Sequence, residues 1–227
     1  MIFEDHAKSP VEGYFKIEVF DKDGNVIDEF EQQNTIMLNS KNTMQYAMAG
    51  RTATDLSDPA NPVEMPIMIN TFMLGTKGHQ GTNILIPRNF DYTMDKMFSF
   101  TENGKVFPIT FDKDGTVIDE GYDPTLPNSR NNGNTTIRIS LLTNNENKII
   151  EYVINIDEQN GNDNGGPIAY TEAALHANLN QNIPGLGDAP GNPLTVNNYG
   201  EIWAMRTFPA KIKDSISSFK ITWRIIF

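Results

Sequence analysis

The strongest constraint on the fold is the alternation at the end of the sequence. Between residues 219 and 227, large apolar side chains occupy every second position and polar ones such as Lys220 and Arg224 lie between them. A period of two is typical of a β-strand with one face in a hydrophobic core. We therefore predict that this strand is locked between neighbours. The predicted core residues are Trp203, Phe219, Ile221, Trp223, Ile225 and Phe227.

A further strand is expected at residues 202–208, directly before the terminal one. The segment from Pro209 to Ser218 is long enough to turn the chain back, so the two strands are predicted to pair as antiparallel neighbours. Proline has no amide hydrogen to donate, and Pro209 therefore fits a sheet edge or a strand end.

Three other pairs of alternating segments predict β-hairpins, with turns at residues 23–24, 114–115 and 143–148. The first two turns are Asp-Gly steps. Asp-Gly between alternating arms favours a type I′ turn, in which both central residues have a positive φ.

The two Asp-Gly turns belong to a repeated decapeptide. Residues 20–29 recur at 111–120 with Asn25 replaced by Thr116 as the only difference, and the flanking residues do not match well. A repeat this short does not establish duplicated domains. Convergence on a good turn sequence and an ancient duplication both stay open.

One helix is expected among the strands. Residues 40–49 place Met44, Ala47 and Met48 at helical spacing, and Gly50 provides a stop signal. With about seven to nine strands, three hairpins and one helix, the pattern predicts a mainly β protein. We expect a single domain over residues 1–227, an antiparallel β-sandwich or jelly-roll-like barrel with one short α-helix and long loops.

The loops themselves are candidate contact segments. Residues 51–66 carry three prolines, and residues 122–134 and 176–199 are rich in Pro, Asn and Gly. Loops of this length usually serve binding or interaction. We predict that these three segments form an interface.

Composition excludes several classes of function. Eighteen basic against 29 acidic residues give a formal net charge of −11, which repels nucleic acid phosphates and anionic lipid headgroups. No apolar run approaches the ~20 residues of a membrane-spanning helix, and residues 1–10 lack the layout of a secretion signal. The absence of cysteine fits folding in a reducing cytoplasm. Direct nucleic acid or membrane binding is not expected.

The sharpest candidate for a metal site is the alternation of carboxylates before each glycine of the repeat. The candidate calcium ligands are Asp21, Asp23, Asp112 and Asp114. Calcium needs six to eight oxygen ligands, and an EF-hand adds a third acidic ligand before the glycine and a glutamate six residues after it. Both are missing here, so a plain hairpin turn is the preferred interpretation and calcium the alternative.

Nothing in the sequence assembles a catalytic centre. The histidines His6, His79 and His176 are far apart, no Gly-x-Ser-x-Gly elbow occurs, and no glycine run has the spacing of a phosphate-binding loop. We expect no enzyme activity and no cofactor.

Several segments, in order, resemble one class of protein. They are Glu29, Asn34, Ile36 and Ser40 leading into the helix, Phe72-x-Leu74-Gly75-Thr76, Thr171-Glu172-Ala173-Ala174-Leu175, Ala204-Met205-Arg206-Thr207-Phe208, and Phe219-x-Ile221-x-Trp223-x-Ile225. This arrangement is similar to small β-rich virion proteins of tailed bacteriophages. Residues 91–166 depart from it, and we expect an elaborated insertion there.

The resemblance implies a structural subunit of a virion, made in the host bacterial cytoplasm and acting through contacts with other virion proteins and with copies of itself in a symmetric homo-oligomer. Tail, collar, baseplate adaptor and capsid-associated or head-decoration roles all stay open. The alternative is a carbohydrate- or receptor-binding β-sandwich module, assisted by calcium at the Asp-Gly turns.

Overall fold

The computed structural model describes residues 11–55, 63–120, 135–143, 147–163, 166–178 and 200–227. Most of them lie in strands, and one antiparallel sheet has the strand order β10-β11-β14-β1-β2-β13-β12-β5-β8-β9. Its strands are β1 (Glu12–Phe20), β2 (Val26–Ile36), β5 (Ile69–Gly75), β8 (Val106–Phe111), β9 (Val117–Glu120), β10 (Thr136–Thr143), β11 (Lys148–Ile156), β12 (Ile168–Ala177), β13 (Glu201–Lys213) and β14 (Ser218–Ile226).

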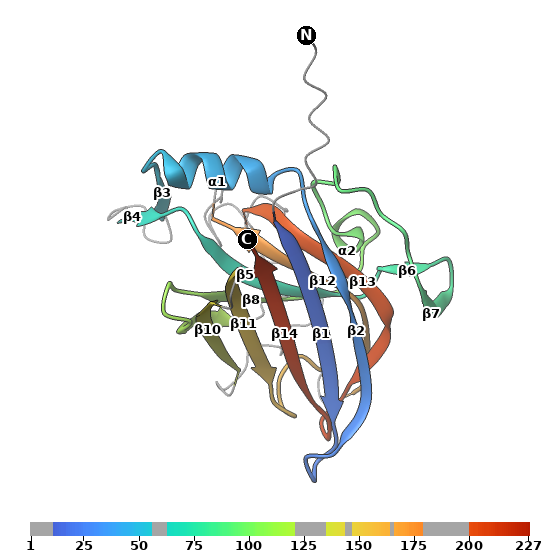
Figure 1. Ribbon diagram of the computed structural model, residues 1–227. Coiled ribbons are helices and arrows are strands. Elements are labelled where there is room, and N and C mark those ends of the chain that lie inside the picture. Colours follow the sequence, from blue (N-terminus) through green and yellow to red (C-terminus); the bar gives the residue numbers. More distant parts are fainter. Residues whose placement is uncertain (1–10, 56–62, 121–134, 144–146, 164–165, 179–199) are drawn as a thin grey trace.

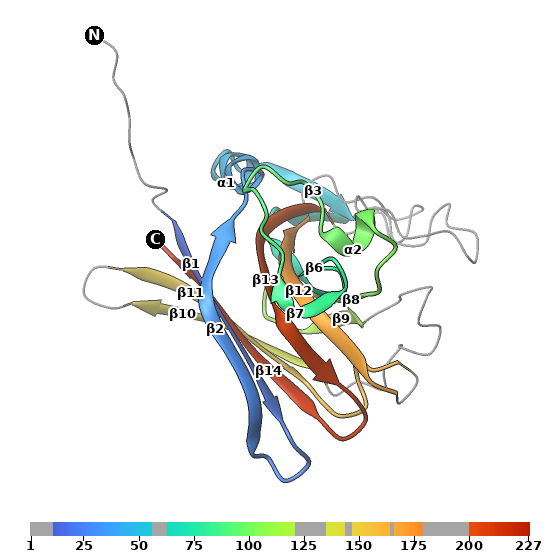
Figure 2. The ribbon, with the colours of Figure 1, turned by 90° about the vertical axis from the view of Figure 1, so that its right-hand side faces the viewer.

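This sheet folds over into two packed layers (Figures 1 and 2). Layer A contains β10, β11, β14, β1 and β2, and layer B contains β13, β12, β5, β8 and β9. The layers are joined where β2 pairs with β13, through Ile36 with Ala204 and Thr35 with Met205. At the opposite side, the β8–β9 turn lies against β10, so the sheet is nearly closed. The predicted mainly β, sandwich-like architecture is confirmed.

The core lies between the layers. Phe15 of β1 stacks on Phe208 of β13 at 5.4 Å between ring centroids, and its ring meets Trp223 edge-on at 4.9 Å. Trp223 also contacts Phe72 of β5 at 6.3 Å. Five predicted core residues are buried there, namely Trp203, Phe219, Ile221, Trp223 and Ile225.

Three predictions about the terminal segments are wrong. Phe227 is 43% exposed, because it pairs with Lys148 beyond the point where layer B covers the strand. β13 and β14 do not pair with each other, since β13 lies between β12 and β2 whereas β14 lies between β1 and β11. Pro209 lies inside β13 rather than at its end. It is tolerated at a bulge, where residues 208–210 lie opposite Thr171 alone.

The three predicted hairpins are confirmed as β1–β2, β8–β9 and β10–β11. The two copies of the decapeptide share one register, including a bulge after the first arm. The predicted type I′ turn is wrong, because φ is positive at Gly24 and Gly115 but not at the aspartates before them.

The predicted helix is confirmed as α1 (Ser40–Met48), ended by Gly50 at a φ of 65°. Its Met48 is exposed rather than buried. A second helix, α2 (Phe98–Thr101), is a single turn. Neither of these helices in the described part of the chain is long and apolar enough to cross a membrane.

Part of the expected loop at 51–66 forms a small ribbon of β3 (Thr52–Asp55) and β4 (Val63–Pro66). The region 91–166 supplies β8 to β11, which lie at the two ends of the large sheet and so belong to the sandwich. Two further strands, β6 (His79–Gln80) and β7 (Asn83–Pro87), form a separate ribbon.

Candidate functional site

The outer face of layer B is covered by the chain between β5 and β8. We call residues 76–105 the cover segment; it contains β6, β7 and α2. Beneath it lies a second apolar cluster rich in methionine, a side chain that fills irregular spaces well. The buried members are Met37, Met73, Met97, Phe98, Ala174, Ile202 and Met205.

A buried carboxylate fastens the cover segment to the sheet. Glu172 projects from the middle of β12 and is fully buried. It accepts hydrogen bonds from the backbone nitrogens of Ser99, at 2.7 Å, and Phe98, at 3.0 Å, and from the hydroxyl of Ser99. Burial raises the pKa of Glu172, while these three donors favour the charged form and oppose the rise.

Ser99 also forms hydrogen bonds with the first residues of the cover segment. Its hydroxyl oxygen accepts hydrogen bonds from the backbone nitrogens of Thr76, at 2.8 Å, and Lys77, at 3.1 Å. Gly78 then packs so closely on β12 that an added Cβ atom would lie 2.4 Å from the carbonyl oxygen of Thr171. The residues that lead into the β6–β7 ribbon are therefore held close against β12. We call them the base of the ribbon.

The other end of the ribbon is held at Arg88. The backbone nitrogen of Arg88 donates to the carbonyl oxygen of Gly78 at 2.8 Å, and its own carbonyl accepts from the hydroxyl of Thr207 at 2.7 Å. The guanidinium group lies 4.0 Å from the ring centre of Phe98 and pairs with Glu102. Both ends of the ribbon are thus tied to layer B or to α2.

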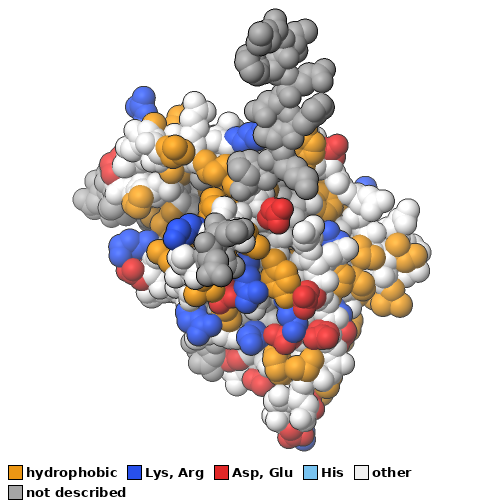
Figure 3. Space-filling view, in the orientation of Figure 1, with side chains coloured by type: hydrophobic (Ala, Val, Ile, Leu, Met, Phe, Trp, Pro, Cys, Tyr) orange, Lys and Arg blue, Asp and Glu red, His pale blue; other side chains and the backbone are white. Residues whose placement is uncertain are grey.

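The ribbon presents three consecutive apolar residues to solvent. Ile84, Leu85 and Ile86, which we call the β7 apolar tip, are all exposed, Leu85 by 67%. In Figure 3, apolar side chains gather at the right-hand edge, where Figure 1 places β6 and β7. A rigid base under an exposed apolar tip is the arrangement expected of a protein contact site.

The outer face of layer A has the opposite character. Positive and negative side chains alternate across it in Figure 3, in ion pairs such as Lys16 with Glu29 at 3.3 Å and Arg224 with Glu151 at 2.7 Å. Charges paired across strands in this way are typical of a solvated sheet face.

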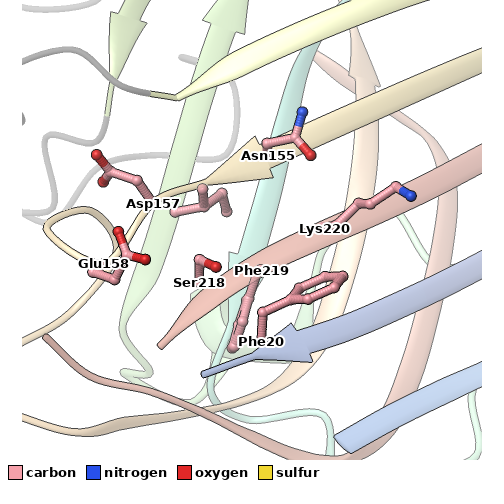
Figure 4. A pocket seen from close by; sticks show the side chains of 8 residues that line it. Phe20, Asn155, Asp157, Glu158, Ser218, Phe219 and Lys220 are labelled. Atoms are coloured by element: carbon pink, nitrogen blue, oxygen red, sulfur yellow. The ribbon is translucent and has the colours of Figure 1, made fainter. Parts of the chain in front are cut away.

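Two of the hollows formed by described residues lie at the ends of the sandwich. One, of about 300 Å³, is shown in Figure 4, where Asp157 and Lys220 lie on opposite sides of it. The other, of about 380 Å³, lies beside α1, and its lining is mainly polar: Asn42, Gln45, Tyr46, Arg51, Thr52, Ile67 and Glu201.

A buried lysine lies near the first hollow. Lys213, at the end of β13, donates from Nζ to the carbonyl oxygens of Asp214 at 2.7 Å and Glu158 at 3.1 Å. Burial lowers the pKa of Lys213 to about 8, against the opposing effect of the carboxylates of Asp157, Asp214 and Glu158. Because Lys213 donates to backbone carbonyl oxygens, we assign it a structural role at the end of β13.

The first aspartate of each candidate calcium site stabilises its own turn through hydrogen bonds. Oδ1 of Asp21 accepts from the backbone nitrogens of Asp23 and Asn25, both at 2.9 Å, and Asp112 makes the same pair of contacts in the second copy. These donors hold the pKa of Asp21 below its usual value. Within the described residues, no group of three or more Asp, Glu or His side chains could hold a metal ion.

The histidines are not brought together. His79 lies on β6, His176 is fully buried on β12, and His6 is outside the described residues. Nδ1 of His176 lies 3.4 Å from the carbonyl oxygen of Gly200, and burial lowers the pKa of His176 to about 4. His176 is therefore a neutral side chain in the core at neutral pH.

Comparison of the chain with protein-family models, with curated proteins and with solved structures found no match. The predicted interface segment 122–134 lies outside the described residues, as do 56–62 and 179–199 of the other two. The β7 apolar tip was not predicted. Its signal in the sequence is a run of three apolar residues closed by Pro87, which does not alternate as a strand with one buried face would.

Proposed function

We propose that this chain is a structural subunit of a bacteriophage virion that acts through protein–protein contacts. The observation that carries the proposal is the β7 apolar tip on its fixed base. Exposing three neighbouring aliphatic side chains is unfavourable in an isolated soluble protein, and such patches usually mark a contact surface. The rigidity of the base means that little conformational entropy is lost when a partner covers the tip.

The virion part of the proposal is supported by the order of the sequence motifs. The segments that resemble phage proteins coincide with the end of β2 and α1, the end of β5, β12, β13 and β14. An acidic protein without cysteine also fits a component that folds in a bacterial cytoplasm and does not bind the genome directly.

The proposal requires that a phage genome encodes the chain, and purified particles of that phage provide the test. Quantitative peptide mass spectrometry should find the chain at a constant ratio to the major capsid protein across a density gradient. A chain that stays in the soluble fraction, with none in the particles, would show that the proposal is wrong.

A pair of variants tests the role of the tip. Leu85→Asp places a charge in the apolar tip and should reduce incorporation into particles at least about tenfold, since desolvating an unpaired carboxylate at an interface costs more than 1.4 kcal/mol. Ile27→Asp is the matched control, because Ile27 is also an exposed aliphatic residue, on the β1–β2 hairpin. Equal incorporation of both variants would exclude the tip as the contact site.

The hollow beside α1 supports a second candidate, a carbohydrate- or receptor-binding module. Exposed Tyr46 next to Asn42, Gln45 and Glu201 combines an aromatic face with groups that hydrogen-bond to hydroxyls, which is the chemistry that a saccharide needs. Binding to a glycan panel that is lost in Tyr46→Ala would favour this function, and binding that depends on added calcium would favour its calcium-assisted form.

A further inference from the structure

The strand β10 forms one edge of the large sheet and is paired on one side only, with β11. Figure 2 shows the β10–β11 hairpin extending away from the body of the molecule. The start of the edge is covered by the β8–β9 turn, where a Cβ atom on Gly115 would lie 2.7 Å from the carbonyl oxygen of Ile137. Among the described residues, no strand pairs with the outer side of Ile139–Thr143. We call residues 139–143 the open edge.

The open edge is apolar on both of its faces. Leu141 is 82% exposed and Leu142 is 41% exposed, and consecutive residues of a strand point to opposite faces. On one face, Leu142 is in register with Ile149 of β11 and, beyond it, Ile226 of β14. On the other face, Leu141 is in register with Ile150.

The open edge is also uncharged. The whole chain has a formal net charge of −11, so most surfaces of two copies repel each other, whereas residues 139–143 contain no acidic or basic side chain. Soluble proteins commonly protect sheet edges with lysine, proline or an inward charge, because free backbone groups recruit another strand. The open edge has none of these protections.

We propose that the open edge pairs with the open edge of a second copy of the chain, antiparallel about a twofold axis. In this arrangement Leu141 and Leu142 of each copy pack against the same residues of the other, and the backbone groups of both edges gain partners. A second copy fits better than a charged partner because the strand offers no charge to recognise, and an antiparallel pair of identical neutral strands opposes no like charges. This dimer is one specific contact within the proposed function. The dimer itself does not depend on that function, but its presence in a virion particle does.

Sedimentation equilibrium of the purified chain over a wide concentration range tests the proposal. The wild type should be a dimer that dissociates on dilution. Leu141→Lys should raise the dissociation constant at least about 100-fold, since it removes two buried leucines per dimer and sets two like charges side by side. Ile27→Lys, at an exposed aliphatic residue of the β1–β2 hairpin, is the matched control and should leave the dissociation constant unchanged.

A wild type that is monomeric at every concentration, or a Leu141→Lys variant that dimerises as the wild type does, would overturn the proposal. Amide hydrogen exchange adds a local measurement: amides within residues 139–143 should be slower to exchange in the dimer than in Leu141→Lys. Urea unfolding of the variant shows whether the monomer is still folded. A chain found in particles but monomeric in solution contradicts the dimer alone, whereas a dimer absent from particles contradicts the proposed function alone.

Discussion

The carboxylate of Glu172 lies 2.7 Å from the backbone nitrogen of Ser99, and both residues are almost completely inaccessible to solvent. A buried charge is unfavourable unless its hydrogen-bonding capacity is used, and here three donors converge on it. Because Ser99 in turn accepts from Thr76 and Lys77, this single acid links the sheet to both ends of the segment that carries the β7 apolar tip.

Replacing Glu172 with alanine should therefore destabilise the protein by about 2–4 kcal/mol, because two backbone N–H groups and one hydroxyl lose their buried acceptor. The free energy of unfolding in urea measures this. Glu29→Ala is the control, since Glu29 forms an exposed ion pair with Lys16 and its loss should cost less than about 1 kcal/mol. Similar losses in the two variants would contradict a structural role for Glu172.

Acid should weaken the fold through His176. Its pKa is about 4 in the folded state, against about 6.5 in an unfolded chain, so the unfolded state binds more protons between these values. Stability is therefore expected to fall as the pH drops from 6.5 to 4, by about 3 kcal/mol from this group. Urea unfolding of His176→Gln and wild type at several pH values measures the difference. Parallel pH profiles would show that His176 does not contribute.

The repeated decapeptide provides a matched pair of glycine variants. Gly24→Ala and Gly115→Ala both place alanine at a positive φ, which costs about 1 kcal/mol. Only at Gly115 does the new Cβ also meet a backbone atom, the carbonyl oxygen of Ile137. Gly115→Ala should therefore lose at least about 1 kcal/mol more in thermal or urea unfolding. Equal losses would show that the β8–β9 turn does not pack on β10 in solution.

The terminal strand provides a second matched pair. Trp223→Ala should cost about 3–5 kcal/mol, because it leaves a cavity between Phe15 and Phe72. Phe227→Ala should cost less than about 1 kcal/mol, since Phe227 is largely outside the core. Urea unfolding followed by far-ultraviolet circular dichroism is suitable, because it does not depend on the tryptophan that is removed.

Local patterns in the sequence predict the strands and hairpins well, because alternation and turn residues act over a few positions. The hairpins about Gly24 and Gly115 are of this kind, as is the end of α1 at Gly50. The partners of β13 and β14 could not be predicted in the same way. Which strands lie side by side depends on how the two layers close, and the bulge at Pro209 lets β13 run through a residue that locally favours a strand end.

The candidate site was harder to predict for a related reason. Glu172 and Ser99 lie far apart in the chain, and nothing near either residue in the sequence indicates that they meet. Phe227 shows the limit of periodicity, since it continues the apolar alternation of β14 but lies beyond the strand that would cover it.

The pairing of β1 with β14, in which Phe15 lies opposite Trp223, has a consequence for biosynthesis. β1 cannot gain β14, its second neighbour in layer A, until the segment around residue 223 has left the ribosome. Contacts that join distant parts of a nascent chain form late and slowly. The β1–β2 hairpin should therefore form early with its apolar face exposed, and such exposed apolar surface in a nascent chain favours aggregation or chaperone binding.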